Sequence, residues 1–134
     1  MAAKLKVACA IIINSERKIL LAQRSSTMKH PLQWEFPGGK IKMNENSFQA
    51  ITREIKEELH VEVSTKQLLK INNWNYGNRE IELHAIICEL LSSDFQLTEH
   101  QQIQWFGMKE LWKLKDLLAA DKEFLQDLEE YLNT

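Results

Sequence analysis

The stretch that decides the fold is residues 39–61, GKIKMNENSFQAITREIKEELHV. Its second half predicts a helix from Ser47 to about His60, because Asn46 or Ser47 is a good N-cap and no helix breaker follows. At about 100° per residue, four apolar side chains fall on one stripe: Phe48, Ile51, Ile55 and Leu59. We therefore expect this helix to pack against a sheet.

Three carboxylates, those of Glu54, Glu57 and Glu58, share a neighbouring face of this helix. Taken alone, such a cluster is most simply a solvated acidic face, partly offset by Arg53 and Lys56. With a Gly-Gly turn beside it, the cluster also suits Mg²⁺, which takes oxygen ligands and is usually bound by one or two carboxylates plus substrate phosphates. The pattern thus indicates a possible hard-cation site.

The composition excludes several functional classes. Among 134 residues, 17 Lys and Arg against 19 Asp and Glu give a net charge of −2, so no general basic face is available to capture a nucleic-acid polymer. No apolar run approaches the length of a membrane span. Cys9 and Cys88 lie in apolar runs and are predicted to be buried, inert thiols in a reducing cytosol, so we expect a cytoplasmic protein.

The order of the predicted elements indicates a mixed α/β fold, and no repeat or linker divides it, so we predict one domain over residues 1–134. Residues 34–40, WEFPGGK, are predicted to form a turn. The tail from Lys109 is predicted to be helical, with Asp121 as a good N-cap for the last helix. Strands are predicted at Leu5–Ile13, Lys18–Gln23, Leu68–Trp74, Glu80–Leu90 and Gln102–Phe106.

Gly39, Glu45 and the run from Arg53 to Val61 resemble the Nudix box, G-x5-E-x7-R-E-U-x-E-E-x-G-U, in which U is aliphatic. Every fixed position matches except the late glycine, which is His60 here. Further segments are similar to the MutT-type branch, which includes 8-oxo-dGTP and CTP pyrophosphohydrolases: Val7–Arg24, Trp34–Lys40, Arg79–Leu90 and Glu99–Trp105. The resemblance implies a Nudix α/β/α sandwich with a mixed β-sheet.

His60 stands where the box has a glycine, which normally supplies a left-handed residue just after the helix. Histidine is enriched among the uncommon non-glycine residues with positive φ. We therefore expect His60 to keep this backbone conformation and to have a structural role.

The resemblance implies a hydrolase acting on phosphoanhydride bonds with Mg²⁺, or alternatively Mn²⁺, as cofactor. In this interpretation Glu54 or Glu99 removes a proton during catalysis, and both choices stay open. Arg53 and Glu45 are expected to form an ion pair that orients the metal ligands. The metal ligands that the resemblance implies are the Gly38 carbonyl, Glu54, Glu57, Glu58 and Glu99.

The resemblance also implies a set of substrate-binding residues: Arg24, Glu35, Phe36, Arg79 and Asp121. Arg24 matches a substrate-contacting arginine, and a carboxylate at Asp121 could accept a hydrogen bond from an exocyclic amine such as cytosine N4. Phe36 and Tyr76 could pack on a base or sugar, although such aromatic side chains more often belong to the core. Three histidines have no metal-ligand spacing and are interpreted as structural or solvent-facing: His30, His84 and His100.

The predicted function is therefore hydrolysis of a nucleoside triphosphate to the monophosphate and pyrophosphate by a monomer or weak homodimer. The biological role would be nucleotide-pool sanitation linked to DNA repair, through 8-oxo-dGTP diphosphatase or CTP/dCTP-type activity. One alternative is a hydrolase of another nucleoside diphosphate derivative. The ADP-ribose branch is disfavoured, because it tends to carry a proline after the box and the only prolines are Pro31 and Pro37. A non-catalytic nucleotide sensor is the second alternative, and such modules usually lose box carboxylates that this chain retains.

Overall fold

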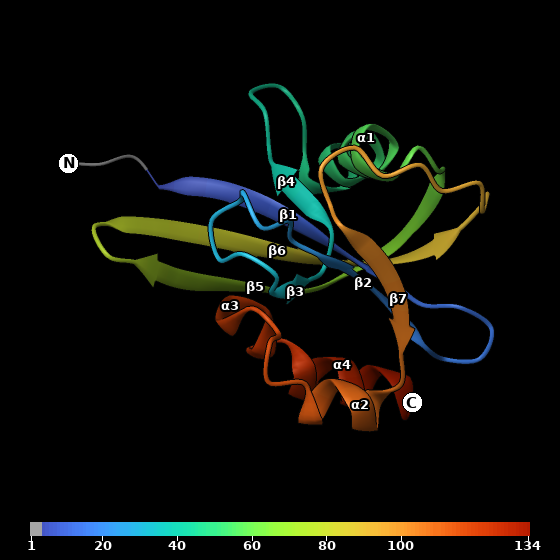
Figure 1. The fold of residues 1–134 in the computed structure, drawn as a ribbon. Helices are drawn as coiled ribbons and strands as arrows, with labels where there is room; N and C mark the ends of the chain where they lie inside the picture. The colour runs from blue at the N-terminus through green and yellow to red at the C-terminus, as the bar shows by residue number, and fades with distance from the viewer. Residues whose placement is uncertain (1–3) are drawn as a thin grey trace.

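The computed structural model describes residues 4–134, coloured along the chain in Figure 1. Along these residues, four strands precede a central helix, and three more strands precede three helices near the C-terminus. Their bounds are β1 (Leu5–Ile12), β2 (Ile19–Gln23), β3 (Trp34–Glu35), β4 (Gly38–Lys40), α1 (Ser47–Leu59), β5 (Val63–Tyr76), β6 (Arg79–Leu90), β7 (Gln102–Phe106), α2 (Met108–Lys113), α3 (Ala119–Lys122) and α4 (Leu125–Leu132).

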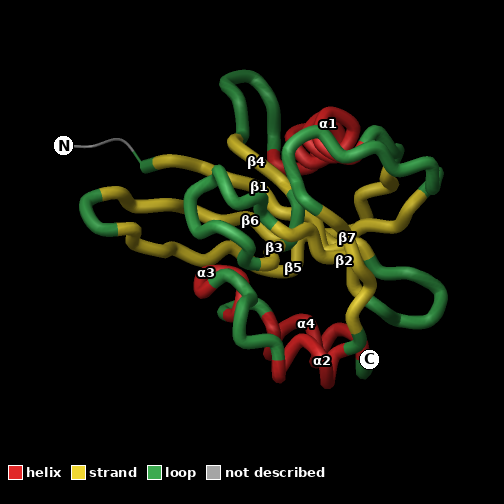
Figure 2. Tube along the Cα trace, in the orientation of Figure 1, coloured by secondary structure: helices red, strands yellow, loops and turns green. Residues whose placement is uncertain are grey.

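The strands form two sheets, one with the order β4-β1-β6-β5 and one with the order β3-β2-β7. Strands β1 and β6 run parallel, whereas the other pairs are antiparallel, so the first sheet is mixed. Helix α1 covers one side of the strands, and α2, α3 and α4 lie on the other (Figures 1 and 2). The predicted mixed α/β sandwich is confirmed.

Helix α1 joins the sheet through the apolar stripe that its sequence predicts. Ile51, Ile55 and Leu59 are fully buried together with Ala50, while Phe48 is half-buried at the edge of the same cluster. Full burial of an Ile or Leu side chain contributes about 1.5–3 kcal/mol. The stripe therefore fixes which face of α1, and so which glutamates, point away from the sheet.

Both ends of α1 are capped by side chains or backbone that the sequence identifies. Asn46 is the N-cap: its side chain accepts from the Gln49 backbone N–H at 2.8 Å, and the Gln49 side chain accepts from the Asn46 backbone N–H at 2.9 Å. His60 follows the helix with φ 59° and ψ 33°, and its backbone N–H donates to the Lys56 carbonyl. The expected left-handed cap at His60 is confirmed.

Three predictions about elements are wrong. Residues 34–40 are not one turn but two short strands, because residues 34–35 pair with β2 while residues 38–40 pair with β1. Strand β5 begins at Val63 and contains two register shifts, which interrupt the alternation that sequence reading relies on. Asp121 lies inside α3 and does not cap the last helix, whose N-cap is Phe124.

Both cysteines are buried, as predicted. Burial raises the pKa of the Cys88 thiol to about 12 and holds the pKa of Cys9 well above its usual value. Both thiols therefore stay protonated and poorly reactive at neutral pH. Within residues 4–134, no helix is long and apolar enough to cross a membrane.

Replacing His60 tests the helix cap directly. Because the residue at this position has positive φ, His60→Gly should change the free energy of unfolding by at most about 1 kcal/mol and leave activity intact. His60→Val should cost about 1–3 kcal/mol, because a β-branched side chain is strained in this conformation. Urea denaturation of the three proteins measures both changes, and a large loss of turnover in His60→Gly would contradict the structural role.

Candidate active site

Strand β4 brings two glycines between β1 and helix α1. Gly39 pairs with Ala8 and Gly38 pairs with Cys9 across the β1–β4 ladder. A Cβ on Gly39 would overlap the Glu54 carboxylate, and a Cβ on Gly38 would overlap the Ala8 carbonyl. Glycine at position 39 therefore allows the Glu54 carboxylate to approach the strand closely, and glycine at position 38 allows β4 to approach the backbone of β1.

The Arg53 guanidinium uses all five of its N–H donors on this part of the molecule. It binds Glu45 with two parallel hydrogen bonds, at 2.6 and 3.1 Å, and donates to the Lys40 carbonyl at 3.0 Å. It also donates to Glu54 at 2.8 Å and to Glu57 at 3.3 Å. The hydrogen bonds that Glu45 accepts from Arg53, followed by the one it accepts from the Lys42 backbone N–H, lower its pKa to about 2. The expected Arg53–Glu45 pair is therefore present, and it ties the loop after β4 to α1.

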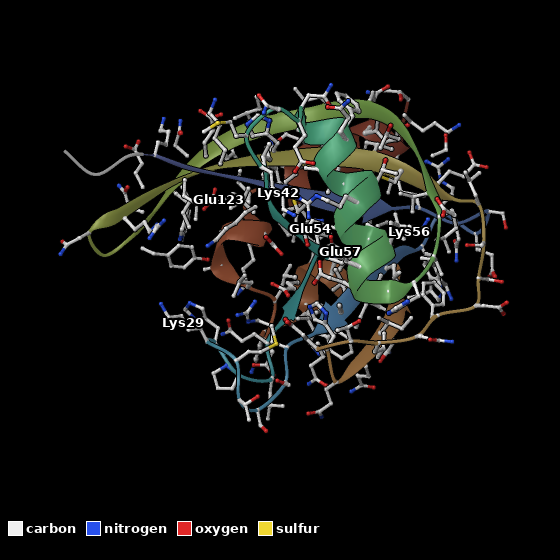
Figure 3. The ribbon with its side chains drawn as sticks, turned by 90° about the horizontal axis from the view of Figure 1, so that it is seen from above. Lys29, Lys42, Glu54, Lys56, Glu57 and Glu123 are labelled. Atoms are coloured by element: carbon white, nitrogen blue, oxygen red, sulfur yellow. The ribbon has the colours of Figure 1, made fainter. Side chains whose placement is uncertain are left out.

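We call the carboxylates gathered here the glutamate corner, which consists of Glu45, Glu54, Glu57 and Glu58. Figure 3 shows Glu54 and Glu57 on one side of α1 and Lys56 on the other. Lys56 pairs with Glu62, at 3.1 Å, and so does not neutralise the corner. The local charge of this side of α1 is therefore strongly negative apart from Arg53.

Glu58 is one of the less exposed carboxyls of the glutamate corner, with 16% of its side chain exposed. Its Oε1 atom is buried without any hydrogen-bond partner. Burial, followed by the charges of Glu35, Glu54 and Glu99, raises the pKa of Glu58 to about 9. A buried carboxylate in these surroundings lacks a positive partner.

His100 is the residue of this region that sequence reasoning missed. Its side chain is fully buried, with Nε2 at 2.7 Å from Glu35 and Nδ1 at 3.6 Å from Glu58. The histidine reaches this place through the loop before β7, and no spacing in the sequence marks it. The only available signal is its position next to Glu99, a predicted metal ligand.

The residues of the glutamate corner fit a hard divalent cation. Within residues 4–134, no three acidic, histidine or cysteine side chains are placed so that they could hold a metal ion as they stand. Glu54 and Glu57 bind Arg53 in this arrangement. The donor set nevertheless consists of oxygens, and the orphaned buried Oε1 of Glu58 is an atom that a cation would satisfy. Glu99 is exposed, yet its charge acts on Glu58. The predicted ligands thus lie around one place, and their role stays a prediction.

A cavity of about 470 Å³ lies next to the glutamate corner, because it is lined by Gly38, whose neighbour Gly39 lies against Glu54. All five predicted substrate-binding residues line this cavity: Arg24, Glu35, Phe36, Arg79 and Asp121. Tyr76 and Trp74 add aromatic walls, and Lys29 and Lys40 add positive charge. The cavity therefore combines aromatic surface with positively charged side chains and two carboxyls, and it lies close to the glutamate corner.

The carboxyls of the cavity are held in defined positions. Glu35 accepts from the Arg24 guanidinium at 2.9 Å through one oxygen and from His100 at 2.7 Å through the other. Asp121 is almost fully buried and accepts from the Phe36 backbone N–H at 2.8 Å through Oδ2. Burial and the neighbouring Glu35 charge hold the pKa of Asp121 well above its usual range. Position 121 therefore fixes the segment after β3 and presents a polar group to the cavity.

Together, fold and site define a hydrolase acting on nucleotide-like substrates. The family model of the NUDIX domain matches residues 3–128, so the chain belongs to this family. It is 36% identical to the CTP pyrophosphohydrolase of Escherichia coli K12, over 75% of each chain. It is 30% identical to the 8-oxo-dGTP diphosphatase of the same organism, over 78% of this chain and 81% of that one. A MutT protein from Methanosarcina mazei Go1 shares the fold, with a TM-score of 0.85 over 100% of both chains at 21% identity.

The buried Glu58 carboxyl predicts a pH dependence for the metal-free protein. Its pKa is near 9 in the folded state and 4.5 in the reference state, so unfolding releases a proton and stability falls as pH rises between these values. Both proteins are compared in a chelating buffer. The unfolding temperature of Glu58→Gln minus that of wild type should therefore be larger at pH 8.5 than at pH 6. Thermal unfolding followed by circular dichroism measures this, and equal pH slopes in the two proteins would contradict it.

Proposed function

We propose that this protein is a Mg²⁺-dependent nucleoside triphosphate pyrophosphohydrolase, converting a nucleoside triphosphate and water to the monophosphate and pyrophosphate. The observation that carries the proposal is the position of two neighbouring glycines of β4: Gly38 lines the cavity, and Gly39 lies against the Glu54 carboxylate of the glutamate corner. A nucleoside in the cavity would thus have its phosphates beside the carboxylates. The names of two relatives, a CTP pyrophosphohydrolase and an 8-oxo-dGTP diphosphatase, agree with this reaction.

The charges of the site explain why a cation is needed. The ionised carboxylates of the glutamate corner would repel a triphosphate, and a divalent cation, when bound, neutralises phosphate charge. The ligands we propose are the Gly38 carbonyl, Glu54, Glu57, Glu58 and Glu99. Mg²⁺ is the proposed ion, and Mn²⁺ the alternative, because all of these donors are oxygens.

The chain's own residues would orient the phosphates and remove a proton. Arg24 and Arg79 line the cavity and provide positive charge for the phosphate chain. Glu54 or Glu99 would take the proton from the attacking water. Arg53 fixes one oxygen of Glu54 at 2.8 Å and so limits its rotation, while Glu99 is exposed on the loop before β7.

Base recognition is assigned to Asp121 and the aromatic walls. Since Oδ2 of Asp121 accepts from Phe36, its other oxygen is left for the edge of a base. An exocyclic amine such as cytosine N4 would suit an ionised carboxylate, and a carbonyl of an oxidised guanine would suit a protonated one. The proposed substrates are therefore CTP-type nucleotides or 8-oxo-dGTP, and the proposed role is cytoplasmic nucleotide-pool sanitation.

Hydrolysis of a nucleotide panel tests the proposed reaction. With Mg²⁺, the protein should release a monophosphate and pyrophosphate from at least one of 8-oxo-dGTP, dGTP, CTP, dCTP and 5-methyl-dCTP. Glu57→Gln should lower kcat/KM at least about tenfold, whereas Glu62→Gln should not, because Glu62 pairs with Lys56 away from the corner. Both glutamates are about half exposed, at 55% and 49%, so the control is matched.

Two outcomes of the panel would overturn this proposal. If no nucleotide is cleaved and calorimetry detects tight binding, the protein is a nucleotide sensor. If nucleotide sugars or dinucleoside polyphosphates are cleaved in preference, the reaction belongs to another class of nucleoside diphosphate derivatives.

Asp121→Asn separates stability from base choice. The amide can still accept from Phe36 and removes a buried carboxyl whose pKa is raised, so the variant should unfold at an equal or higher temperature at pH 8. The ratio of kcat/KM between cytosine and 8-oxoguanine nucleotides should change by about 5-fold or more, as expected for one altered base contact. An unchanged ratio would show that position 121 does not contact the base.

A further inference from the structure

Two buried polar atoms without a hydrogen-bond partner meet at one point of the described chain. They are Oε1 of Glu58 and Nδ1 of His100, and within residues 4–134 no other buried side-chain nitrogen or oxygen is left in this state. The two side chains face each other, with His100 Nδ1 at 3.6 Å from Glu58 Oε2. Unsatisfied buried polar groups are rare in folded proteins, so a pair of them calls for an explanation.

The other nitrogen of His100 points into the substrate side of the site. Its Nε2 lies 2.7 Å from Glu35 Oε2, and because an ionised carboxylate only accepts, the imidazole N–H donates in this hydrogen bond. Glu35 in turn accepts from Arg24, which lines the cavity. The imidazole ring thus stands between Glu35, which lines the cavity, and Glu58, which belongs to the glutamate corner.

A purely structural role would not require this arrangement. The loop before β7 is already fastened by its backbone: Gln96 and Thr98 donate to the carbonyls at the end of α1, and Gln101 donates to Gln23. Thr98 also donates through its hydroxyl to the Glu57 carbonyl, at 2.9 Å. The loop therefore keeps its path without the two side-chain contacts of the imidazole.

We propose that His100 is a positioning residue that couples the nucleotide cavity to the cation ligand Glu58, through the series Arg24, Glu35, His100 and Glu58. Arg24 on a phosphate fixes Glu35, Glu35 fixes the ring, and the ring limits the rotation of Glu58. Outer partners of this kind orient metal ligands, and their loss typically costs about 10–100-fold in metal affinity or activity. This inference rests on the proposed function, because only in that function is Glu58 a cation ligand.

Two substitutions separate the two sides of the ring. The amide nitrogen of His100→Gln can occupy the place of Nε2 and keep the Glu35 contact, whereas that of His100→Asn can occupy the place of Nδ1 and keep the Glu58 contact. Mn²⁺ affinity is measured on nucleotide-free protein by electron paramagnetic resonance, and kcat and KM are measured separately. His100→Gln should weaken Mn²⁺ binding about tenfold or more with little change in KM. His100→Asn should bind Mn²⁺ nearly as wild type does and should raise KM.

His84→Gln is the matched control. His84 makes the same kind of contact, with its Nε2 at 2.7 Å from Glu82, but it does not line the cavity. This variant should leave Mn²⁺ affinity and KM within about twofold of wild type. Thermal unfolding of all variants shows whether each one is folded under the conditions of the measurements.

If neither His100 variant folds, Glu35→Gln tests the same coupling from the other end. Glu35 is not a proposed cation ligand, yet its substitution should weaken Mn²⁺ binding more than about twofold through the ring. The coupling would be overturned if every folded variant kept its Mn²⁺ affinity and KM within about twofold of wild type. It would also be overturned if both His100 variants lost Mn²⁺ affinity equally. A wild-type protein that binds Mn²⁺ but cleaves no nucleotide would instead contradict the proposed function.

Discussion

Five hydrogen bonds from one guanidinium hold the glutamate corner in place. Arg53 gathers Glu45 from the loop, Glu54 and Glu57 from α1, and the Lys40 carbonyl from the end of β4. Without this cation, the carboxylates would repel one another and Glu45 would lose its side-chain attachment to the helix. The same contacts keep α1 aligned with the glycine strand, and the position of the candidate cation site depends on that alignment.

The protein has a net charge of −2, and its proposed substrate is a polyanion. The distribution of the charged side chains explains how the two are compatible. The negative residues are concentrated beside α1, whereas Arg24, Lys40 and Arg79 lie around the adjoining cavity. Strand β4 lies between the acidic side of α1 and the cavity, and at Gly38 and Gly39 it has no side chains. A phosphate chain lying across this strand would have cations of the protein on one side and carboxylates on the other.

Regular, local features of the sequence were sufficient to predict much of this arrangement. The apolar stripe placed α1, Asn46 gave its start, and the box pattern pointed to Arg53 and its glutamates. What could not be predicted depends on contacts between distant segments: the two strands within residues 34–40 are defined by different partners. Asp121 binds a backbone N–H 85 residues away, and burial of His100 arises from a loop closing over Glu35 and Glu58.

The central claim is that the glutamate corner is a cation site serving the nucleotide cavity. The most direct measurement is the anomalous scattering of Mn²⁺ in crystals of the protein grown with a non-hydrolysable nucleoside triphosphate. We expect a peak beside the Gly38 carbonyl and Glu58, with the phosphates next to it and the nucleoside in the cavity lined by Asp121. Mn²⁺ bound only elsewhere, or a nucleotide seated away from Gly38, would contradict it.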